Sequence, residues 1–374
     1  MSIIIKIGIG LLNIFYTLLK CLPVQNKITY ISRQMNTTPD DFKRLHDYYA
    51  DHHPELKQVI LTKMIPESKI GKIGYCFHMI KQMYHIATSK AVILDTYCIP
   101  ISILHQRKSL VVVQIWHALG AFKKFGYSVL DSKEGSSSKT AKLMHMHENY
   151  TYVLTSSLHC LPYFQEAFNA RDDQMQIYPL PRLDLFYDAE HINNTINSIY
   201  NIYPEIRDTH KKVIVYAPTF RKGDQSSLIQ GIQSLIDTLS DEYLIILKKH
   251  PLTEFKINDA RVIEDTQFDS ISMFLVADYI VTDYSASMYE AVLVNKPIYF
   301  YAFDYDQYVE NRNFYEPYKS LVPGEIAYNA SELKTLLNKE PSMETVSLFK
   351  QTMIKPFNHS YTKDLADFIY SKIN

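Results

Sequence analysis

The amino-acid sequence predicts an α/β protein with two domains, each built around a parallel sheet. The chain has 374 residues, which exceeds the ~250–300 residues that a single core usually organises. Its composition, 47% hydrophobic and 21% charged, is typical of a folded globular protein. Short apolar, β-branched runs alternate along it with amphipathic stretches. This alternation is the pattern of strands and helices in parallel α/β folds.

The first domain is assigned to residues 25–205. Apolar runs predict strands at 27–31, 57–61, 90–94, 110–115 and 151–154, and helical periodicity predicts helices near 39–50, 68–86 and 157–168. The second domain is assigned to residues 206–345. Its strands are expected at 212–216, 243–248, 261–263, 279–282 and 297–300.

A polar stretch at 189–211, with Asn193, Asn194 and Asn197, separates the two series and marks the expected boundary. Residues 346–374 are expected to form C-terminal helices. Two facing α/β units leave a cleft at the carboxyl ends of their strands, where ligands usually bind. The residues directly after strands are therefore the first candidates for a site.

Residues 1–24 form the one strongly apolar segment. The polar residues Ser2, Lys6, Asn13, Thr17 and Lys20 fall on one stripe of a helix, and apolar residues cover the rest. This pattern favours a helix lying in the membrane interface, with its lysines near lipid headgroups. A true span and a buried or oligomer-forming helix are the alternatives. A cleaved signal is less expected, because Lys20 precedes Cys21 where a lipoprotein signal needs a small residue.

Composition excludes several classes of function. Lys and Arg (39) balance Asp and Glu (40), so no nucleic-acid partner is expected. The four cysteines form no C-x-x-C pair, which predicts neither a zinc site nor disulfides and fits a reducing cytoplasm. Only ten glycines are present, with no P-loop or dinucleotide-binding fingerprint. A bound phosphate would have to be held by helix ends and side chains.

Two motifs that follow predicted strands contain a potential general base or a hydroxyl group. In the first, Trp116-His117-Ala118-Leu119-Gly120 precedes two lysines, so a general base could stand beside cations that attract an anion. A packed core histidine with surface lysines explains the same pattern. The second is Pro218-Thr219-Phe220-Arg221, where Thr219 could offer a hydroxyl and an N–H group to phosphate and Arg221 a bidentate contact. An ordinary turn is the alternative.

Two further motifs lie in the second domain. Lys248, Lys249 and His250 end a buried strand, which is best tolerated if they face a negative ligand; a solvated strand end is the alternative. Around Asp283 and Ser285 a strand passes into a helix, whose free N–H groups could hold a diphosphate without glycine. The same residues could simply cap that helix.

Taken in order, the motifs W-H…K-K…G, Y-A-P-T-x-R, L-K-x-H-P and T-D-Y-S-x-S resemble the CDP-glycerol glycerophosphotransferase family, the teichoic acid primases and polymerases. The resemblance runs from about Ser32 to Asn313 and includes Lys296 to Tyr301 and Asp304. It implies two Rossmann-like domains facing a central cleft in a glycosyltransferase-B-like (GT-B-like) architecture, with an amphipathic membrane-facing part. The donor site would lie mainly in the second domain.

The resemblance also implies roles for individual residues. His117 would be the catalytic base, with Trp116, Ala118, Leu119 and Gly120 forming the loop over the reacting phosphate. Arg182 matches an arginine in the family's P-R-x-D segment. The nucleotide and diphosphate would be lined by Pro218, Thr219, Arg221, Lys248, Lys249, Asp283, Ser285 and Ala286, and Glu290 would hold a ligand hydroxyl. His250 would act as a second catalytic residue, offsetting charge on the departing phosphate.

The implied reaction transfers a polyol phosphate, most simply glycerol phosphate from CDP-glycerol, to a hydroxyl of a lipid-linked saccharide acceptor and releases CMP. CDP-ribitol as donor, a nucleotide-sugar glycosyltransferase and an inactive membrane-bound scaffold are the alternatives. No residue cluster has the spacing of a metal cage, and a loosely held Mg²⁺ is left open. The protein is expected on the cytoplasmic face of the cell membrane as a peripheral protein, and a homo-oligomer is left open.

Overall fold

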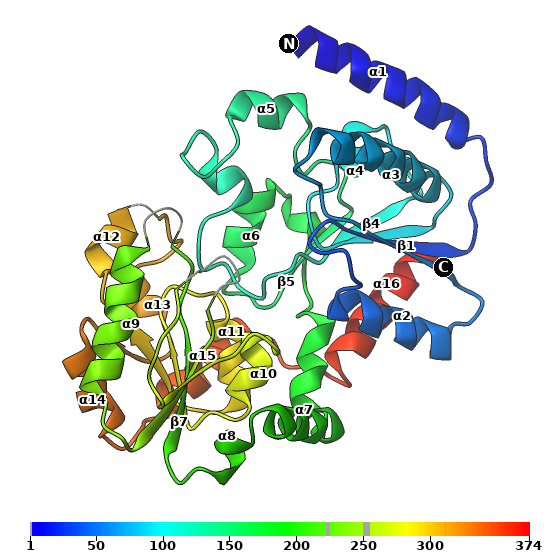
Figure 1. Ribbon diagram of the computed structural model, residues 1–374. Helices are drawn as coiled ribbons and strands as arrows, with labels where there is room; N and C mark the ends of the chain where they lie inside the picture. The colour runs from blue at the N-terminus through cyan, green and yellow to red at the C-terminus, as the bar shows by residue number, and fades with distance from the viewer. Residues whose placement is uncertain (1, 222–224, 250–254, 311) are drawn as a thin grey trace. The chain divides into compact units, whose positions relative to one another are not determined.

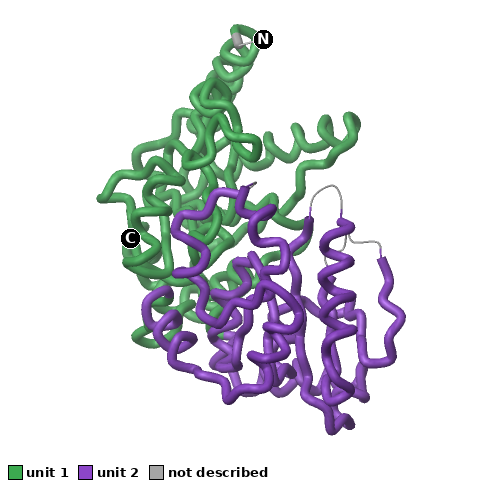
Figure 2. Tube along the Cα trace, turned by 90° about the vertical axis from the view of Figure 1, so that its left-hand side faces the viewer, with its two compact units in different colours: residues 1–184, 354–374 green, residues 185–353 purple. Residues whose placement is uncertain are grey.

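The computed structural model describes residues 2–221, 225–249, 255–310 and 312–374. Within these residues the strands form two parallel sheets of six strands each. Figure 1 shows the course of the chain through these strands and the helices. The chain divides into two compact units. Unit 1 comprises residues 1–184 and 354–374, and unit 2 comprises residues 185–353 (Figure 2). The predicted α/β class with two parallel sheets is confirmed, whereas the expected cleft between the domains stays a prediction.

Unit 1 contains the sheet with strand order β2-β1-β3-β4-β5-β6. Its strands are β1 Lys27–Ser32, β2 Lys57–Thr62, β3 Ala91–Leu94, β4 Val111–Gln114, β5 Tyr152–Thr155 and β6 Met175–Ile177. The longer helices are α2 Asp40–His52, α3 Lys69–Ala87, α6 Leu161–Phe168 and α16 Tyr361–Ile373. Every residue of β1, β3 and β4 is buried, because helices cover both faces of the sheet (Figure 1).

Unit 2 contains the sheet with strand order β12-β11-β10-β7-β8-β9. Its strands are β7 Lys212–Ala217, β8 Tyr243–Leu247, β9 Val262–Glu264, β10 Tyr279–Thr282, β11 Ile298–Tyr301 and β12 Glu325–Ala327. The core lies between the sheet and the helices α9 Ser226–Thr238 and α14 Ala330–Leu337. All strands expected from the sequence are present. The missed strands, β6 and β12, are three-residue edge strands, too short to show periodicity.

The C-terminal segment is split between the two units and does not stand apart as expected for residues 346–374. Helix α15, Glu344–Met353, belongs to unit 2, whereas α16 packs on α2 in unit 1. The Tyr49 hydroxyl donates to the Ala366 carbonyl at 2.8 Å. The Asp184 carboxylate accepts the N–H groups of Tyr361 at 2.8 Å and Thr362 at 2.9 Å. These contacts satisfy the free N–H groups at the start of α16.

The boundary between the units also differs from the expected one at residue 205. It lies after Asp184, so helices α7 Ala189–Ile202 and α8 Pro204–Asp208 are part of unit 2. The Tyr203 hydroxyl ties them to the loop after β9 by donating to Asp265 at 2.6 Å. The asparagines that suggested a linker occupy the exposed face of α7, which is why the segment looks polar.

Helix α1, Ser2–Leu19, turns Asn13 and Tyr16 toward the protein, whereas Lys6 and Thr17 of the polar stripe stay exposed. Asn13 donates to the Ile103 carbonyl at 3.0 Å and accepts the His105 N–H at 2.8 Å, and the buried Tyr16 donates to Gln106 at 2.6 Å. Lys20, expected near lipid headgroups, donates to the His105 carbonyl at 2.7 Å. Among the described residues, no helix combines the length and the apolar character needed to cross a membrane.

Candidate functional site

Three neighbouring strands of unit 1 end beside one another and bring His117, Asp95 and Arg33 to one edge of the sheet. In the register, Ile31 of β1 pairs with Leu94 of β3, which pairs with Gln114 of β4. The chain positions just beyond these residues are therefore adjacent. In parallel α/β folds, ligands usually bind at this edge, outside the carboxyl ends of the strands.

His117 is held in one tautomer by the backbone. Its Nδ1 lies 2.9 Å from the Asp95 carbonyl oxygen, which can only accept a hydrogen bond. Nδ1 therefore carries the proton, and Nε2 keeps its lone pair. Burial lowers the pKa of His117, and the bond to the carbonyl opposes this shift only in part. The imidazole is thus neutral near pH 7 and able to accept a proton.

The loop around His117 is fixed by packing and hydrogen bonds. Trp116 adopts a left-handed φ of 59°, and its ring lies 4.1 Å from the imidazole and stacks on Phe125 at 5.1 Å between ring centroids. The carbonyl of the buried Leu119 accepts a hydrogen bond from Ser156. Gly120 is buried and Ala118 half-buried. Packing and hydrogen bonds therefore hold this loop in place, and its position over a reacting phosphate stays a prediction.

Arg182 connects this loop to helix α2. Its side chain forms an ion pair with Asp41 at 2.6 Å and donates to the His117 carbonyl at 3.0 Å. Asp41 also accepts the backbone N–H of Arg182 at 2.8 Å. In the same P-R-x-D segment Asp184 caps α16. The structure thus brings Arg182 to the His117 loop, a contact that the sequence analysis did not predict, and it shows the arginine held by a buried carboxylate.

Asp95 is a residue that the sequence analysis missed. It follows β3 directly and is only 3% exposed. Burial raises its pKa to about 6, although hydrogen bonds from Ser32 and Thr96 oppose the shift. Its Oδ1 has no hydrogen-bond partner among the described residues. An acidic residue placed directly after a buried strand was the signal that could have identified it.

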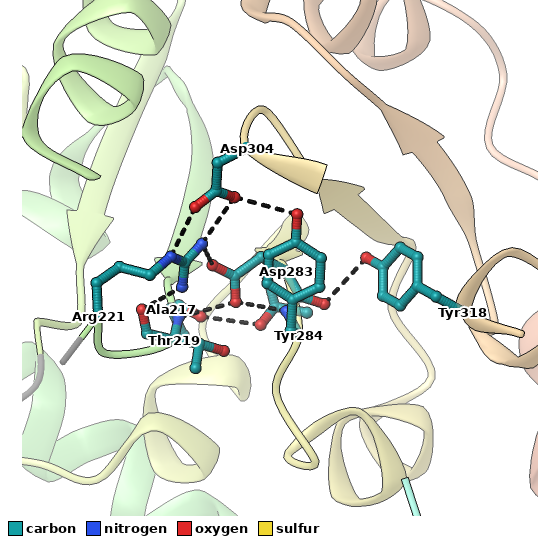
Figure 3. A network of polar contacts seen from close by, with 8 residues as sticks. Ala217, Thr219, Arg221, Asp283, Tyr284, Asp304 and Tyr318 are labelled. Carbon is teal, nitrogen blue, oxygen red and sulfur yellow. Dashed lines mark hydrogen bonds and ion pairs between the residues drawn. The ribbon is translucent and has the colours of Figure 1, made fainter. Parts of the chain in front are cut away.

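In unit 2, Arg221 lies at the centre of a buried network (Figure 3). Its guanidinium contacts Asp304 at 2.7 Å and Asp283 at 3.0 Å, and it donates to the Thr219 carbonyl at 2.6 Å. Burial by itself would lower the pKa of Arg221, but the two carboxylates outweigh it and raise that pKa further. The predicted bidentate contact to phosphate is at odds with this geometry, because the guanidinium is engaged by protein carboxylates.

The same network orients Thr219. The Asp283 carboxylate accepts the N–H groups of Thr219 at 2.8 Å and Tyr284 at 2.6 Å, while Tyr318 donates to the Asp283 carbonyl at 3.1 Å. Pro218 is buried. The Thr219 hydroxyl is inaccessible to solvent and has no partner among the described residues. Asp283 therefore holds Thr219 in place, and the threonine keeps an unused hydroxyl.

The lysines after β8 have carboxylate partners of their own. Lys248 is buried, pairs with Asp265 at 2.5 Å and donates to the Phe268 carbonyl. Lys249 pairs with Glu264 at 2.8 Å. These lysines end a buried strand, as expected. The negative charges beside them, however, are carboxylates of the protein and not those of a ligand. His250 lies outside the described residues.

The turn after β10 carries the remaining predicted residues. Ser285 accepts the Ser287 N–H at 3.2 Å and contacts the Ser287 hydroxyl at 2.8 Å. Ala286 is exposed and Glu290 half-buried. The helix that follows, α11 Met288–Ala291, has only four residues. Its dipole is correspondingly small, so a diphosphate here would depend on the turn itself.

The predicted residues therefore form two groups, one in each unit. Unit 1 joins His117, its loop and Arg182; in unit 2, Asp283 links Arg221 and Thr219 to the turn after β10. Among the residues that the structure describes, no group of three acidic, histidine or cysteine side chains could hold a metal ion.

Comparisons with known proteins agree with these motifs. The model of the CDP-Glycerol:Poly(glycerophosphate) glycerophosphotransferase family matches residues 14–367. A teichoic acid ribitol-phosphate primase of Bacillus spizizenii is 33% identical, over 97% of this chain and 96% of its own length. A teichoic acid glycerol-phosphate primase of Bacillus subtilis is 28% identical, over 79% of this chain and 77% of its own length.

The fold has a close counterpart among solved structures. The wall teichoic acid polymerase TagF gives a TM-score of 0.73 at 19% identity, covering 94% of this chain and 90% of the polymerase chain. This likeness concerns the fold. Because the family model spans almost the whole sequence and the relatives align over most of their length, the chain belongs to the CDP-glycerol glycerophosphotransferase family.

Proposed function

We propose that this protein transfers a polyol phosphate from its CDP ester to a hydroxyl of a lipid-linked teichoic acid precursor and releases CMP. The observation that carries the proposal is the geometry of His117. The Asp95 carbonyl fixes its tautomer at 2.9 Å, and burial keeps the ring neutral. A neutral imidazole with a free Nε2 is the general base that an attacking hydroxyl needs. Membership of the family supplies the reaction type.

In the proposed reaction the acceptor hydroxyl attacks the phosphorus that bears the polyol. His117 Nε2 takes the hydroxyl proton as the new P–O bond forms. The bond between that phosphorus and the bridging oxygen breaks, and CMP leaves with the electron pair. Positioning and charge neutralisation supply most of the acceleration in such transfers. Thr219, Ser285, Glu290 and His250 are assigned to the donor side.

The family resemblance most simply implies glycerol as the transferred polyol, and ribitol is the second candidate. One observation favours ribitol: the relative that is 33% identical over 97% of this chain is a ribitol-phosphate primase. The glycerol-phosphate primase of Bacillus subtilis is 28% identical over a shorter stretch. The two donors share the CDP group, so the proposed mechanism is the same for both.

Incubation with CDP-glycerol, CDP-ribitol or a UDP-sugar, each with a lipid-linked disaccharide acceptor, tests this function. With a CDP donor we expect release of CMP and a product that is heavier than the acceptor by one polyol phosphate, as measured by mass spectrometry. Each incubation is run once with Mg²⁺ and once with a chelator. His117→Ala should lower the rate of CMP release ~10²–10⁴-fold, since the general base is lost.

His145→Ala, which removes an exposed histidine of the same unit, is the matched control and should keep full activity. Transfer from the UDP-sugar alone would favour the glycosyltransferase alternative. An absence of turnover with every donor would favour the inactive scaffold. Full CMP release by His117→Ala would refute the assigned base.

Arg221 is proposed to position Thr219 for the donor. Arg221→Gln leaves the buried carboxylates of Asp283 and Asp304 without their cation, which typically costs ~3–5 kcal/mol of unfolding free energy. Urea denaturation followed by circular dichroism measures this loss. Trp116, the one tryptophan of the sequence, lies in unit 1, so its fluorescence should keep the wild-type midpoint.

Arg171→Gln is the control for this substitution, because Arg171 and its partner Asp173 are both 70% exposed. Such a surface pair is worth at most ~1 kcal/mol. If Arg221→Gln is as stable as the control, the network does not hold the loop and the positioning role is wrong.

We also propose that unit 1 docks on the cytoplasmic face of an anionic membrane. The outer face of α1 exposes Ile3, Ile4, Ile7, Leu11, Ile14 and Leu18, and α3, which contacts α1, exposes Ile70, Ile73, Phe77 and Ile80. The spacing of the α3 residues keeps them on one stripe. Neither helix contains an acidic residue, whereas Lys6, Lys69, Lys72 and Lys81 are exposed. An apolar face flanked by lysines is suited to anionic headgroups.

Co-sedimentation with phosphatidylglycerol vesicles tests this docking. Ile7→Glu with Ile14→Glu, and separately Ile73→Glu with Phe77→Glu, should release most of the protein into the supernatant, because each pair puts carboxylates into the apolar face. Leu348→Glu changes an equally exposed leucine of unit 2 and should leave binding unaltered. Wild-type binding by both double variants would exclude these helices as the membrane face.

A further inference from the structure

Arg33 has no place in the family motifs, although it lies beside the proposed base. It follows β1 directly, and its backbone N–H donates to the Thr96 hydroxyl at 3.2 Å. Two strand spacings separate β1 from β4, which puts the segments of Arg33 and His117 about 10 Å apart. Burial is the largest cause of the lowered pKa of His117, and the charges of Arg182 and Arg33 add to it. The guanidinium is thus within electrostatic reach of the imidazole.

The guanidinium of Arg33 is uncommitted, unlike that of Arg182. It lies over the Tyr97 ring at 5.1 Å from the ring centroid. Among the described residues it forms no ion pair with a carboxylate and donates no side-chain hydrogen bond. Arg33 is half-buried and lines a small hollow of about 10 Å³ with Tyr75, Gln82 and Thr96. A half-buried guanidinium whose contact is with an aromatic ring keeps its N–H donors for an anionic ligand.

We infer that Arg33 binds a phosphate group of the acceptor. This inference rests on the proposed function, in which the donor phosphates belong to the residues of unit 2 and the acceptor hydroxyl to His117. A guanidinium fork matches the oxygens of a phosphate in geometry as well as charge. The phosphate could belong to the lipid diphosphate or to a polyol phosphate already attached to the saccharide. In either case the reacting end of the acceptor is recognised through its negative charge.

Helix α3 links this site to the proposed membrane face. Its inner residues Tyr75 and Gln82 are buried beside Arg33. Its outer residues, among them Ile73 and Phe77, are exposed. The same helix therefore presents an apolar stripe on one side and packs beside Arg33 on the other. This arrangement suits a ligand that is both lipid-linked and anionic.

Kinetics with varied acceptors test the inference on the full chain. Arg33→Gln should raise the acceptor KM ~10–100-fold, because a charge-assisted hydrogen bond is lost, while leaving thermal protection by the CDP donor unchanged. Arg33→Lys should restore part of the affinity, since it keeps the charge without the fork. Arg171→Gln, which removes an exposed guanidinium of the same unit, should behave as wild type.

Three acceptor analogues separate the sources of phosphate: a lipid diphosphate disaccharide, an alkyl disaccharide bearing one polyol phosphate, and a neutral alkyl disaccharide. The phosphate-bearing analogue whose use depends on Arg33 identifies the source. Thermal protection by the phosphate-bearing analogues without donor gives a readout independent of turnover, and it should be weaker in Arg33→Gln than in the wild type and the Arg171→Gln control. Equal KM values in wild type and Arg33→Gln, or equal losses with the neutral analogue, would overturn the inference. Absence of CMP release by the wild type would instead count against the proposed function.

Discussion

Buried carboxylates paired with arginines are the constraint on which both candidate sites depend. Asp41 holds Arg182, which reaches the His117 carbonyl, and Asp283 with Asp304 holds Arg221 beneath Thr219. A buried charge is tolerated only when a partner and hydrogen bonds compensate its desolvation. Loops that follow strands would otherwise be the most variable parts of the fold. The ion pairs therefore restrain these loops.

This constraint also separates the cations that build the site from the groups left for ligands. Arg182, Arg221, Lys248 and Lys249 have protein acceptors, so their charge is largely balanced within the structure. The Thr219 hydroxyl, in contrast, has no partner among the described residues. Nε2 of His117 keeps its lone pair as a consequence of the bond at Nδ1. The proposed specificity for an anionic substrate then depends on few groups, among them the guanidinium of Arg33.

The sequence predicted the fold because strand and helix periodicities in this chain are strong, and it placed His117 and Thr219 correctly after strands. It missed β6 and β12, because each has only three residues, too few to show the alternation that identifies a strand. It assigned Arg221 to phosphate because its carboxylate partners, Asp283 and Asp304, lie far along the chain. The same holds for Asp41, which is 141 residues from Arg182. Pairings of this kind are set by tertiary contacts, which local patterns do not encode.

The dependence of CMP release on pH tests the central claim, that a neutral His117 is the base, most directly. Because burial lowers its pKa, the rate should fall on acidification with a midpoint below the ordinary histidine value of about 6.5. Burial raises the pKa of Asp95 to about 6, so the Asp95→Asn variant is needed to distinguish the titration of His117 from that of Asp95. In this variant the fall in rate at acidic pH, the acid limb, should persist. Loss of the acid limb in His117→Ala would complete the assignment of His117 as the base. An acid limb at or above the ordinary histidine value, or one that survives in His117→Ala, would contradict the account.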